Sequence, residues 1–232
     1  MKNNKTNIKV VIPAFNEEKS IAKVIAAIPM ELVSEVIVVN NSSSDDTKEN
    51  AIKAGATVLD ENRKGYGWAC LKGIDYAESN EAEIIVFLDG DFSDYPEQLV
   101  DVVRPILEEN HDLVIGSRAL GNRENGSMTV PQLFGNWLAT RLMRVFYGIK
   151  FTDLGPFRAI KVDALKKLKM SDKTYGWTIE MQIRAAQKKL NCTEVPVDYK
   201  NRIGKSKVSG TVKGTILAGY KILFAIIKYK FV

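Results

Sequence analysis

The sequence predicts an α/β fold in which a mostly parallel sheet carries helices on both of its faces. Three observations predict it. Strand-like and helix-like runs alternate through the first half of the chain, and the strand-like runs are short and almost wholly apolar, as in strands that are covered on both sides. Polar clusters directly follow several of these strands. Because ligands of such sheets bind beyond the carboxyl ends of the strands, the fold class also predicts where a site lies.

The first half of the chain supplies the alternating elements. Residues 8–12 form a β-branched run that Pro13 ends, and helical spacing of apolar residues follows it. We expect Asn16 to cap this first helix, and Asp94 to cap the helix over 96–107. The predicted strands are 8–12, 35–39, 56–59, 83–88 and 111–115, and the predicted helices are 17–28, 46 onward, 66–77 and 96–107.

The second half is less regular. Residues 131–147 and 177–190 show helical periodicity, and residues 157–160 read as a short strand. Residues 194–199 read as an edge strand, because Pro196 has no amide proton to give to a neighbouring strand. No repeat, low-complexity tract or linker rich in Pro, Gly and Ser divides the chain, so a second independent domain is not expected.

Length and composition fit one ordinary domain. Of the 232 residues, 45% are hydrophobic, which is enough to build a core. The formal charge of +5 favours an anionic partner: nucleic acid, nucleotide phosphate or anionic lipid. The two cysteines lack metal-type spacing, and a single histidine rules out a multi-histidine metal site. The polar start shows no secretory leader, so we expect a reduced, cytoplasmic chain.

One of the polar clusters contains a pair of carboxylates. Asp89 and Asp91 flank Gly90 at the end of the most apolar strand, and residues two apart on extended backbone project to the same side. Their hard oxygens suit Mg²⁺ or Mn²⁺, which keep several waters and accept substrate phosphates as further ligands. The pair therefore predicts a metal-bound diphosphate. The strand-end clusters are 16–17, 40–46, 89–91 and 117–118.

Three segments together resemble the signatures of glycosyltransferase family 2. They are VIPAFNEE at 11–18, VVNNSSSDDT at 38–47 and FLDGD at 87–91. The resemblance implies the GT-A fold, a Rossmann-like sheet whose aspartate motif holds a metal-bound nucleotide sugar. Downstream, VIGSR at 114–118, DLGPFRA at 153–159 and RIGKSK at 202–207 resemble the branch typified by dolichol-phosphate-mannose synthase, whose members glycosylate a polyprenyl phosphate.

The resemblance assigns roles to individual residues on the donor side. Asp89 and Asp91 are the expected metal ligands, and with Arg118 they make up the expected catalytic set. The second motif departs from the usual Asp-Asp-Gly-Ser, since this chain has Asn40-Asn41-Ser42-Ser43, which leaves the identity of the base open. The expected nucleotide-sugar-binding residues are Pro13, Phe15, Glu17, Asn40, Lys64, Asp89 and Asp91.

Basic residues point to an anionic acceptor. Arg binds phosphate oxygens in a planar, bidentate manner, and Lys adds a point charge. A phosphate monoester is already anionic near neutral pH, so an inverting transfer of a hexose from a UDP- or GDP-sugar to polyprenyl phosphate needs no general base. The expected acceptor-phosphate set is Arg118, Arg202, Ser206 and Lys207, with Lys205 beside it.

Two alternatives stay open. A family 2 enzyme that acts on a sugar hydroxyl would need a carboxylate base, for which Asp153 and Glu180 are the candidates; either can instead orient the donor sugar. The other alternative is a non-catalytic, membrane-associated module that binds nucleotide sugars. Nucleic-acid binding is not expected, because the strand-end loops are acidic.

The C-terminal segment predicts membrane contact. Residues 208–232 follow a single GT-A catalytic domain, whose nucleotide-sugar half spans about 1–120 and whose acceptor half spans 121–207. Lys213, Lys221 and Lys228 fall within about 80° on a helical wheel, which describes an amphipathic helix suited to an anionic membrane surface. We therefore expect a peripheral protein on the inner face of the membrane. The alternative is a helix packed on the domain or on a second subunit of a homodimer.

Overall fold

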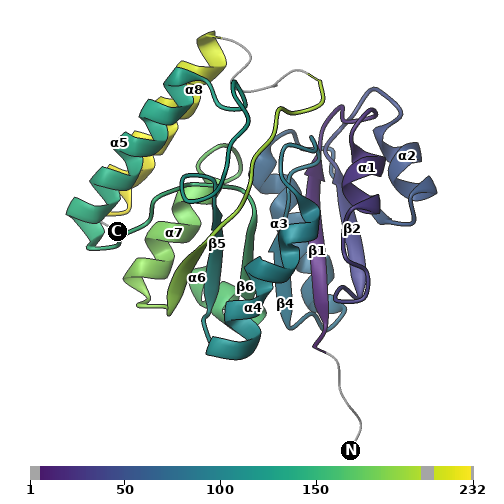
Figure 1. Cartoon of the computed structure of the whole chain (residues 1–232), viewed down its shortest axis with the longest axis horizontal. Helices are drawn as coiled ribbons and strands as arrows, with labels where there is room; N and C mark the ends of the chain where they lie inside the picture. The colour runs from purple at the N-terminus through teal and green to yellow at the C-terminus, as the bar shows by residue number, and fades with distance from the viewer. Residues whose placement is uncertain (1–5, 205–211, 231–232) are drawn as a thin grey trace, which may run out of the picture.

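The computed structural model describes residues 6–204 and 212–230, and these form an α/β domain around one seven-stranded sheet. The strand order is β3-β2-β1-β4-β6-β5-β7, and Figure 1 shows the sheet in the middle of the molecule. The strands are β1 (Ile8–Ala14), β2 (Glu35–Asn40), β3 (Thr57–Asp60), β4 (Ile84–Phe87), β5 (Leu113–Ser117), β6 (Arg158–Lys161) and β7 (Cys192–Pro196).

Strand directions bring the polar clusters to one edge of the sheet. β1 pairs in parallel with β2 and β4, whereas β6 is antiparallel to both β4 and β5. β4 and β5 therefore run in the same direction, and their carboxyl ends meet those of β1 and β2. This topology confirms the predicted, mostly parallel sheet. β7 pairs with β5 as an edge strand, as predicted for the segment around Pro196.

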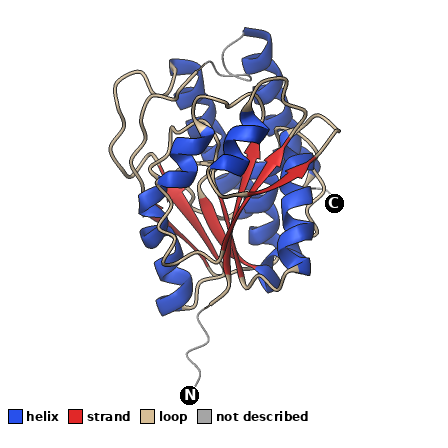
Figure 2. Ribbon diagram, turned by 90° about the vertical axis from the view of Figure 1, so that its right-hand side faces the viewer, coloured by secondary structure: helices blue, strands red, loops and turns tan. Residues whose placement is uncertain are grey.

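Helices cover both faces of the sheet (Figure 2). Val11 of β1 belongs to one core cluster with Phe87 and Trp177, while Val10 and Ile12 belong to a second cluster on the opposite face. Because successive side chains of β1 enter cores on opposite faces of the sheet, every position is buried and the strand is almost wholly apolar instead of alternating between apolar and polar residues. The helices are α1 (Ile21–Ala26), α2 (Thr47–Lys53), α3 (Tyr66–Ser79), α4 (Leu99–Glu109), α5 (Val130–Tyr147), α6 (Val162–Leu168), α7 (Trp177–Gln187) and α8 (Val212–Lys228).

Both predicted helix caps are wrong. Asn16 has a left-handed backbone (φ 55°), and its Oδ1 accepts a hydrogen bond from the Ser44 amide at 2.8 Å, so it joins two strand-end loops and caps no helix. Asp94 is buried, and neither of its carboxylate oxygens has a hydrogen-bond partner in the described part of the chain. A backbone bridge to Tyr199 draws Asp94 inward, and a 3₁₀ turn at Pro96–Gln98 leads into α4. Helix α6 was not predicted.

The C-terminal helix packs on the domain. α8 contacts α5 and α7, and Figure 1 shows α5 and α8 side by side at one end of the molecule. The Tyr147 hydroxyl donates to the Ile226 carbonyl at 2.6 Å, and the Gln187 side chain donates to the Tyr229 carbonyl at 2.6 Å. Within residues 6–204 and 212–230, no helix has the length and apolar character needed to cross a membrane.

Close contact between α3 and the sheet gives a test of this packing. A Cβ built on Gly73 would lie 2.4 Å from Cγ1 of Val11, so Gly73→Ala overpacks the interface. We expect it to destabilise the protein by about 1–3 kcal/mol, measured by chemical denaturation. Gly135→Ala is the control, because it is also inside a helix but its Cβ meets nothing within 4 Å. Equal stability of the two variants would contradict the packing.

Candidate functional site

A cavity of about 570 Å³ opens at the carboxyl ends of the strands. Its walls come from the loops after β1 and β4, the start of α3, and helices α5 and α8. Segments far apart in the sequence therefore meet around one space. The cavity lining includes these predicted site residues: Pro13, Phe15, Glu17, Lys64, Asp89, Asp91, Arg118 and Arg202.

The loop after β1 is held by the loop after β2. The Glu17 amide donates to the Thr47 hydroxyl at 2.7 Å, and the Asn16 amide donates to the Ser43 hydroxyl at 3.0 Å. These bonds bury Glu17, whose carboxylate accepts the Ser20 hydroxyl at 3.0 Å. A buried carboxylate at the cavity wall is a fixed acceptor for ligand hydroxyl groups.

The two aspartates after β4 occupy different environments. Asp89 accepts a hydrogen bond from the Tyr66 hydroxyl at 3.1 Å, and burial together with the nearby Asp91 raises the pKa of Asp89 to about 7. Oδ1 of Asp91 accepts the Ser93 amide at 2.9 Å, which leaves Oδ2 facing Arg202. The two carboxylates have little access to solvent, so their negative charges repel each other. A cation bound by both carboxylates and by a ligand would lower the energy of the site.

A late segment of the chain completes the aspartate loop. The Ile203 amide donates to the Asp91 carbonyl at 2.9 Å, and the Lys200 amide donates to the Ser93 carbonyl at 2.9 Å. This pairing places Nη2 of Arg202 3.0 Å from Asp91 Oδ2 and 3.4 Å from Glu17 Oε1. The Nε atom of Arg202 is buried with no hydrogen-bond partner among the described residues.

The residues present fit a divalent cation. Asp89 and Asp91 supply hard oxygens, and the guanidinium of Arg202 already lies against Asp91, which shows that this position favours positive charge. No cluster of three or more Asp, Glu, His or Cys side chains suited to a metal occurs in the described part of the chain. Mg²⁺ is commonly held in this way, by one or two carboxylates plus the phosphates of a substrate.

Arg118 and Asp153, predicted for separate tasks, pair with each other. Nε and Nη2 of Arg118 each lie 2.7 Å from a carboxylate oxygen of Asp153, and the Arg118 amide donates to Asp153 at 2.8 Å. Burial acts to raise the pKa of Asp153, but the charge and hydrogen bonds of Arg118 hold it below its usual value. The guanidinium also lies 5.0 Å from the centre of the Tyr199 ring.

Glu180 lies outside the cavity lining. Its carboxylate is buried in α7, where it accepts hydrogen bonds from Ser171, Arg184 and Tyr229. Burial acts to raise the pKa of Glu180, but the hydrogen bonds from Ser171, from the Asp172 amide and from Tyr229 hold it below its usual value. The structure thus gives Glu180 the task of tying α7 to the segment before it and to the C-terminal turn.

The second motif contributes through Asn41 more than through Asn40. Asn40 donates to Asp60 at 2.9 Å and accepts the Ser43 amide at 3.1 Å, and it is not part of the cavity lining. Asn41 lines the cavity and binds the loop after β3, donating to the Arg63 carbonyl and accepting the Gly65 amide, both at 2.8 Å. The predicted residues Lys205, Ser206 and Lys207 lie outside the described residues.

Besides Asn41, the prediction omits three residues at or beside the cavity. Tyr66 and Tyr199 line the cavity, and Arg158 is fully buried beside it, donating to the carbonyls of Leu154 and Gly155. Burial lowers the pKa of Arg158 to about 10. Arg158 lies in the DLGPFRA motif at 153–159, and Tyr66 follows the basic residues Arg63 and Lys64, so the sequence around both residues indicates a site. The sequence around Tyr199 gives no such indication, because only the fold brings it to Arg118.

Comparisons with known proteins agree with this geometry. The sequence profile described as glycosyl transferase family 2 matches residues 9–169. An uncharacterised protein of Methanocaldococcus jannaschii is 33% identical over 98% of this chain and 93% of its own. The undecaprenyl-phosphate mannosyltransferase of Micrococcus luteus is 28% identical over 89% of this chain and 89% of its own.

A solved structure extends the comparison to the fold. Glucosyl-3-phosphoglycerate synthase from Mycobacterium tuberculosis, crystallised with Mn²⁺, uridine diphosphate and glucosyl-3-phosphoglycerate, is 23% identical to this chain. It superposes with a TM-score of 0.78, covering 98% of this chain and 81% of that one. This likeness confirms the predicted GT-A fold.

Asp94 gives a prediction about stability. Burial, followed by the charges of Asp89 and Asp91, raises the pKa of Asp94 well above its usual value. The folded protein therefore keeps a proton that the unfolded chain has lost, and stability falls as the pH rises above the usual range of an aspartate. Asp94→Asn removes this penalty, so we expect it to raise the melting temperature of the metal-free protein at pH 8, with a smaller gain at pH 5. Asp75→Asn, at an exposed position of α3, is the control. A pH-independent difference would contradict the assignment.

Proposed function

This chain belongs to glycosyl transferase family 2, and we propose that it moves a hexose from a nucleotide diphosphate sugar to a polyprenyl phosphate, with inversion and without a general base. The observation that carries the proposal is the composition of the cavity. Asp89 and Asp91 lie in its wall together with Arg118 and Arg202, and Pro131 of α5 and Ile222 of α8 add apolar side chains to the same wall. Such a cavity suits two anionic substrates, one of which has an apolar tail.

The donor half is built around the aspartates. Pro13, Phe15 and Glu17 would receive the base and ribose, and Lys64, whose Nζ lies 5.7 Å from the centre of the Phe15 ring, would meet the diphosphate. Asp89 and Asp91 would hold Mg²⁺ or Mn²⁺, and the positive charge of the ion would offset the negative charge of the departing diphosphate. The Mn²⁺ and uridine diphosphate bound to the M. tuberculosis enzyme support this use of the fold.

The acceptor half depends on Arg202. In the structure Arg202 binds Asp91, a carboxylate that the loaded donor would engage. Arg202 would then lose this partner and turn its planar guanidinium to the acceptor phosphate. Binding of the donor thus prepares the acceptor site, and catalysis is positioning plus electrostatic stabilisation. Arg118 lines the same space but stays paired with Asp153.

The alternative with a sugar hydroxyl as acceptor has less support. Its base would be Asp153 or Glu180, but a carboxylate whose pKa is lowered is a weak base near neutral pH. Glu180 is also outside the cavity lining. The undecaprenyl phosphate named for the M. luteus relative favours a lipid phosphate. We include peripheral contact with the inner face of the membrane, through α8, in the proposal.

The metal ligand is tested by Asp91→Ala. We expect turnover to fall by at least about a hundredfold with the melting temperature little changed, because charge stabilisation of the leaving diphosphate is lost. Asp91→Asn, which keeps the size of the side chain, should lose activity equally, and Asp75→Ala is the exposed control. Release of nucleoside diphosphate is the measurement. Near-normal activity of the Asp91 variants would refute the mechanism.

The acceptor role is tested by Arg202→Ala. We expect the KM for polyprenyl phosphate to rise at least about tenfold, since a charge-assisted hydrogen bond is worth about 1.5–3 kcal/mol. The affinity for nucleoside diphosphate with Mn²⁺, measured by calorimetry, should change much less. Arg202→Lys should recover part of the loss. Equal loss of donor and acceptor binding would contradict this assignment.

A further inference from the structure

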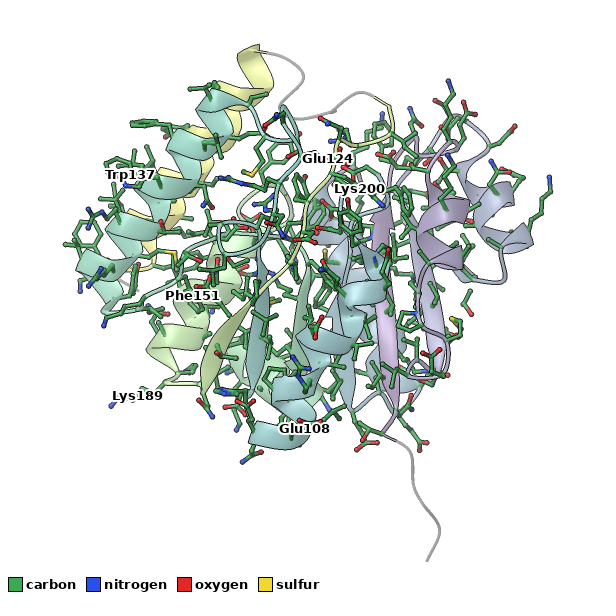
Figure 3. The ribbon with its side chains drawn as sticks, in the orientation of Figure 1. Glu108, Glu124, Trp137, Phe151, Lys189 and Lys200 are labelled. Carbon is green, nitrogen blue, oxygen red and sulfur yellow. The ribbon has the colours of Figure 1, made fainter. Side chains whose placement is uncertain are left out.

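Helix α5 exposes large apolar side chains that no described element covers. Phe134 is 60% exposed and Trp137 is 53% exposed, and their ring centres lie 5.8 Å apart. Val130 and Val145 continue the same side of the helix, because they are four residues before Phe134 and eight after Trp137. Figure 3 shows Trp137 on the outer side of α5, away from the sheet. An exposed apolar stripe of this kind is typical of a surface that binds another protein or a membrane.

Helix α8 extends the apolar surface. Tyr220, Phe224 and Ile227 are exposed, and the first two rings stack with centres 6.1 Å apart. α8 packs along α5, and Lys230 of the turn after it donates to the Phe146 carbonyl at 2.8 Å. The two helices therefore form one layer, named here the α5–α8 layer.

The charges of this layer select its partner. Residues 130–150 and 212–230 contain no Asp or Glu. A second copy of the chain would bring like charges together with no acidic partner, which disfavours a homodimer through this face. An anionic membrane is complementary, and each basic residue near such a surface contributes about 1 kcal/mol. The exposed basic residues of the two segments, among the described side chains, are Arg141, Arg144, Lys150, Lys228 and Lys230.

The cavity is continuous with the same layer. Pro131 and Gly135 of α5, with Ile222 of α8, line the space that Asp91 and Arg202 also line. We propose that the α5–α8 layer docks on an anionic lipid surface, with Phe134 and Trp137 inserted among the lipids. This inference deepens the membrane contact of the proposed function by adding α5 and its inserted side chains, and it rests on that function where it adds that the tail of a lipid phosphate leaves the cavity between the two helices.

Vesicle binding tests the docking without any turnover. Purified full-length protein is sedimented with vesicles of phosphatidylcholine alone or mixed with phosphatidylglycerol. The mixed vesicles should bind the wild type, and the double variant Phe134→Ser/Trp137→Ser should bind at least about tenfold more weakly, because burial of each aromatic side chain is worth about 1.5–3 kcal/mol. Ile52→Ser is the matched control, because Ile52 of α2 is 53% exposed but lies on another helix. The control should bind like the wild type.

The other outcomes separate docking from catalysis. Binding of the double variant equal to that of the wild type would overturn the proposal. The proposal would also be overturned if the wild type did not bind vesicles but formed a dimer, and if the double substitution abolished that dimer. A second copy of the chain would then cover the layer. With a short, water-soluble polyprenyl phosphate the double variant should keep wild-type turnover, because neither side chain lines the cavity. A wild type that binds vesicles but transfers sugar to no acceptor would support docking and refute the proposed function.

Discussion

The contact between Asp91 and the segment around Arg202 is the interaction on which the rest of the site depends. Backbone hydrogen bonds from Lys200 and Ile203 fix this segment against the aspartate loop, and Arg202 then reaches Asp91 at 3.0 Å. Through this contact the irregular second half of the chain forms a wall of the cavity that the regular first half builds. The donor loop and the candidate acceptor residue are therefore parts of one substructure.

The same contact balances the charge of the site. Asp91 and Asp94 are buried, whereas Asp89 is partly exposed. Burial and the charge of Asp91 raise the pKa of Asp89, and burial and the charges of Asp89 and Asp91 raise the pKa of Asp94, so negative charge is concentrated here. Arg118 and Arg202 offset part of this negative charge. A site of this kind would gain from a bound cation, and Arg202 would then be free to leave Asp91. The geometry thus links the proposed metal to the proposed acceptor group.

The sequence predicted what depends on short-range pattern. Apolar runs and helical spacing located the strands, and the polar clusters at their ends located the site, because strand direction alone decides where those clusters meet. What depends on distant pairing was not predictable. The residues next to Arg118 and Asp153 in the sequence do not indicate that these two side chains pair. Asp94 has the sequence pattern of a helix cap, because its backbone partner Tyr199 lies far along the chain. The same holds for Asn40 and Asn41, because hydrogen bonds to Asp60 and to the loop after β3 decide which of the two amides faces the cavity.

The most direct measurement of the central claim is a screen of the wild-type protein with UDP- and GDP-sugars, with and without polyprenyl phosphate and with and without Mg²⁺ or Mn²⁺. We predict that one donor yields a glycosylated lipid phosphate and nucleoside diphosphate, and that both products require the metal and the acceptor. Transfer to a sugar hydroxyl with no use of polyprenyl phosphate, or turnover that persists after chelation of the metal, would contradict the account.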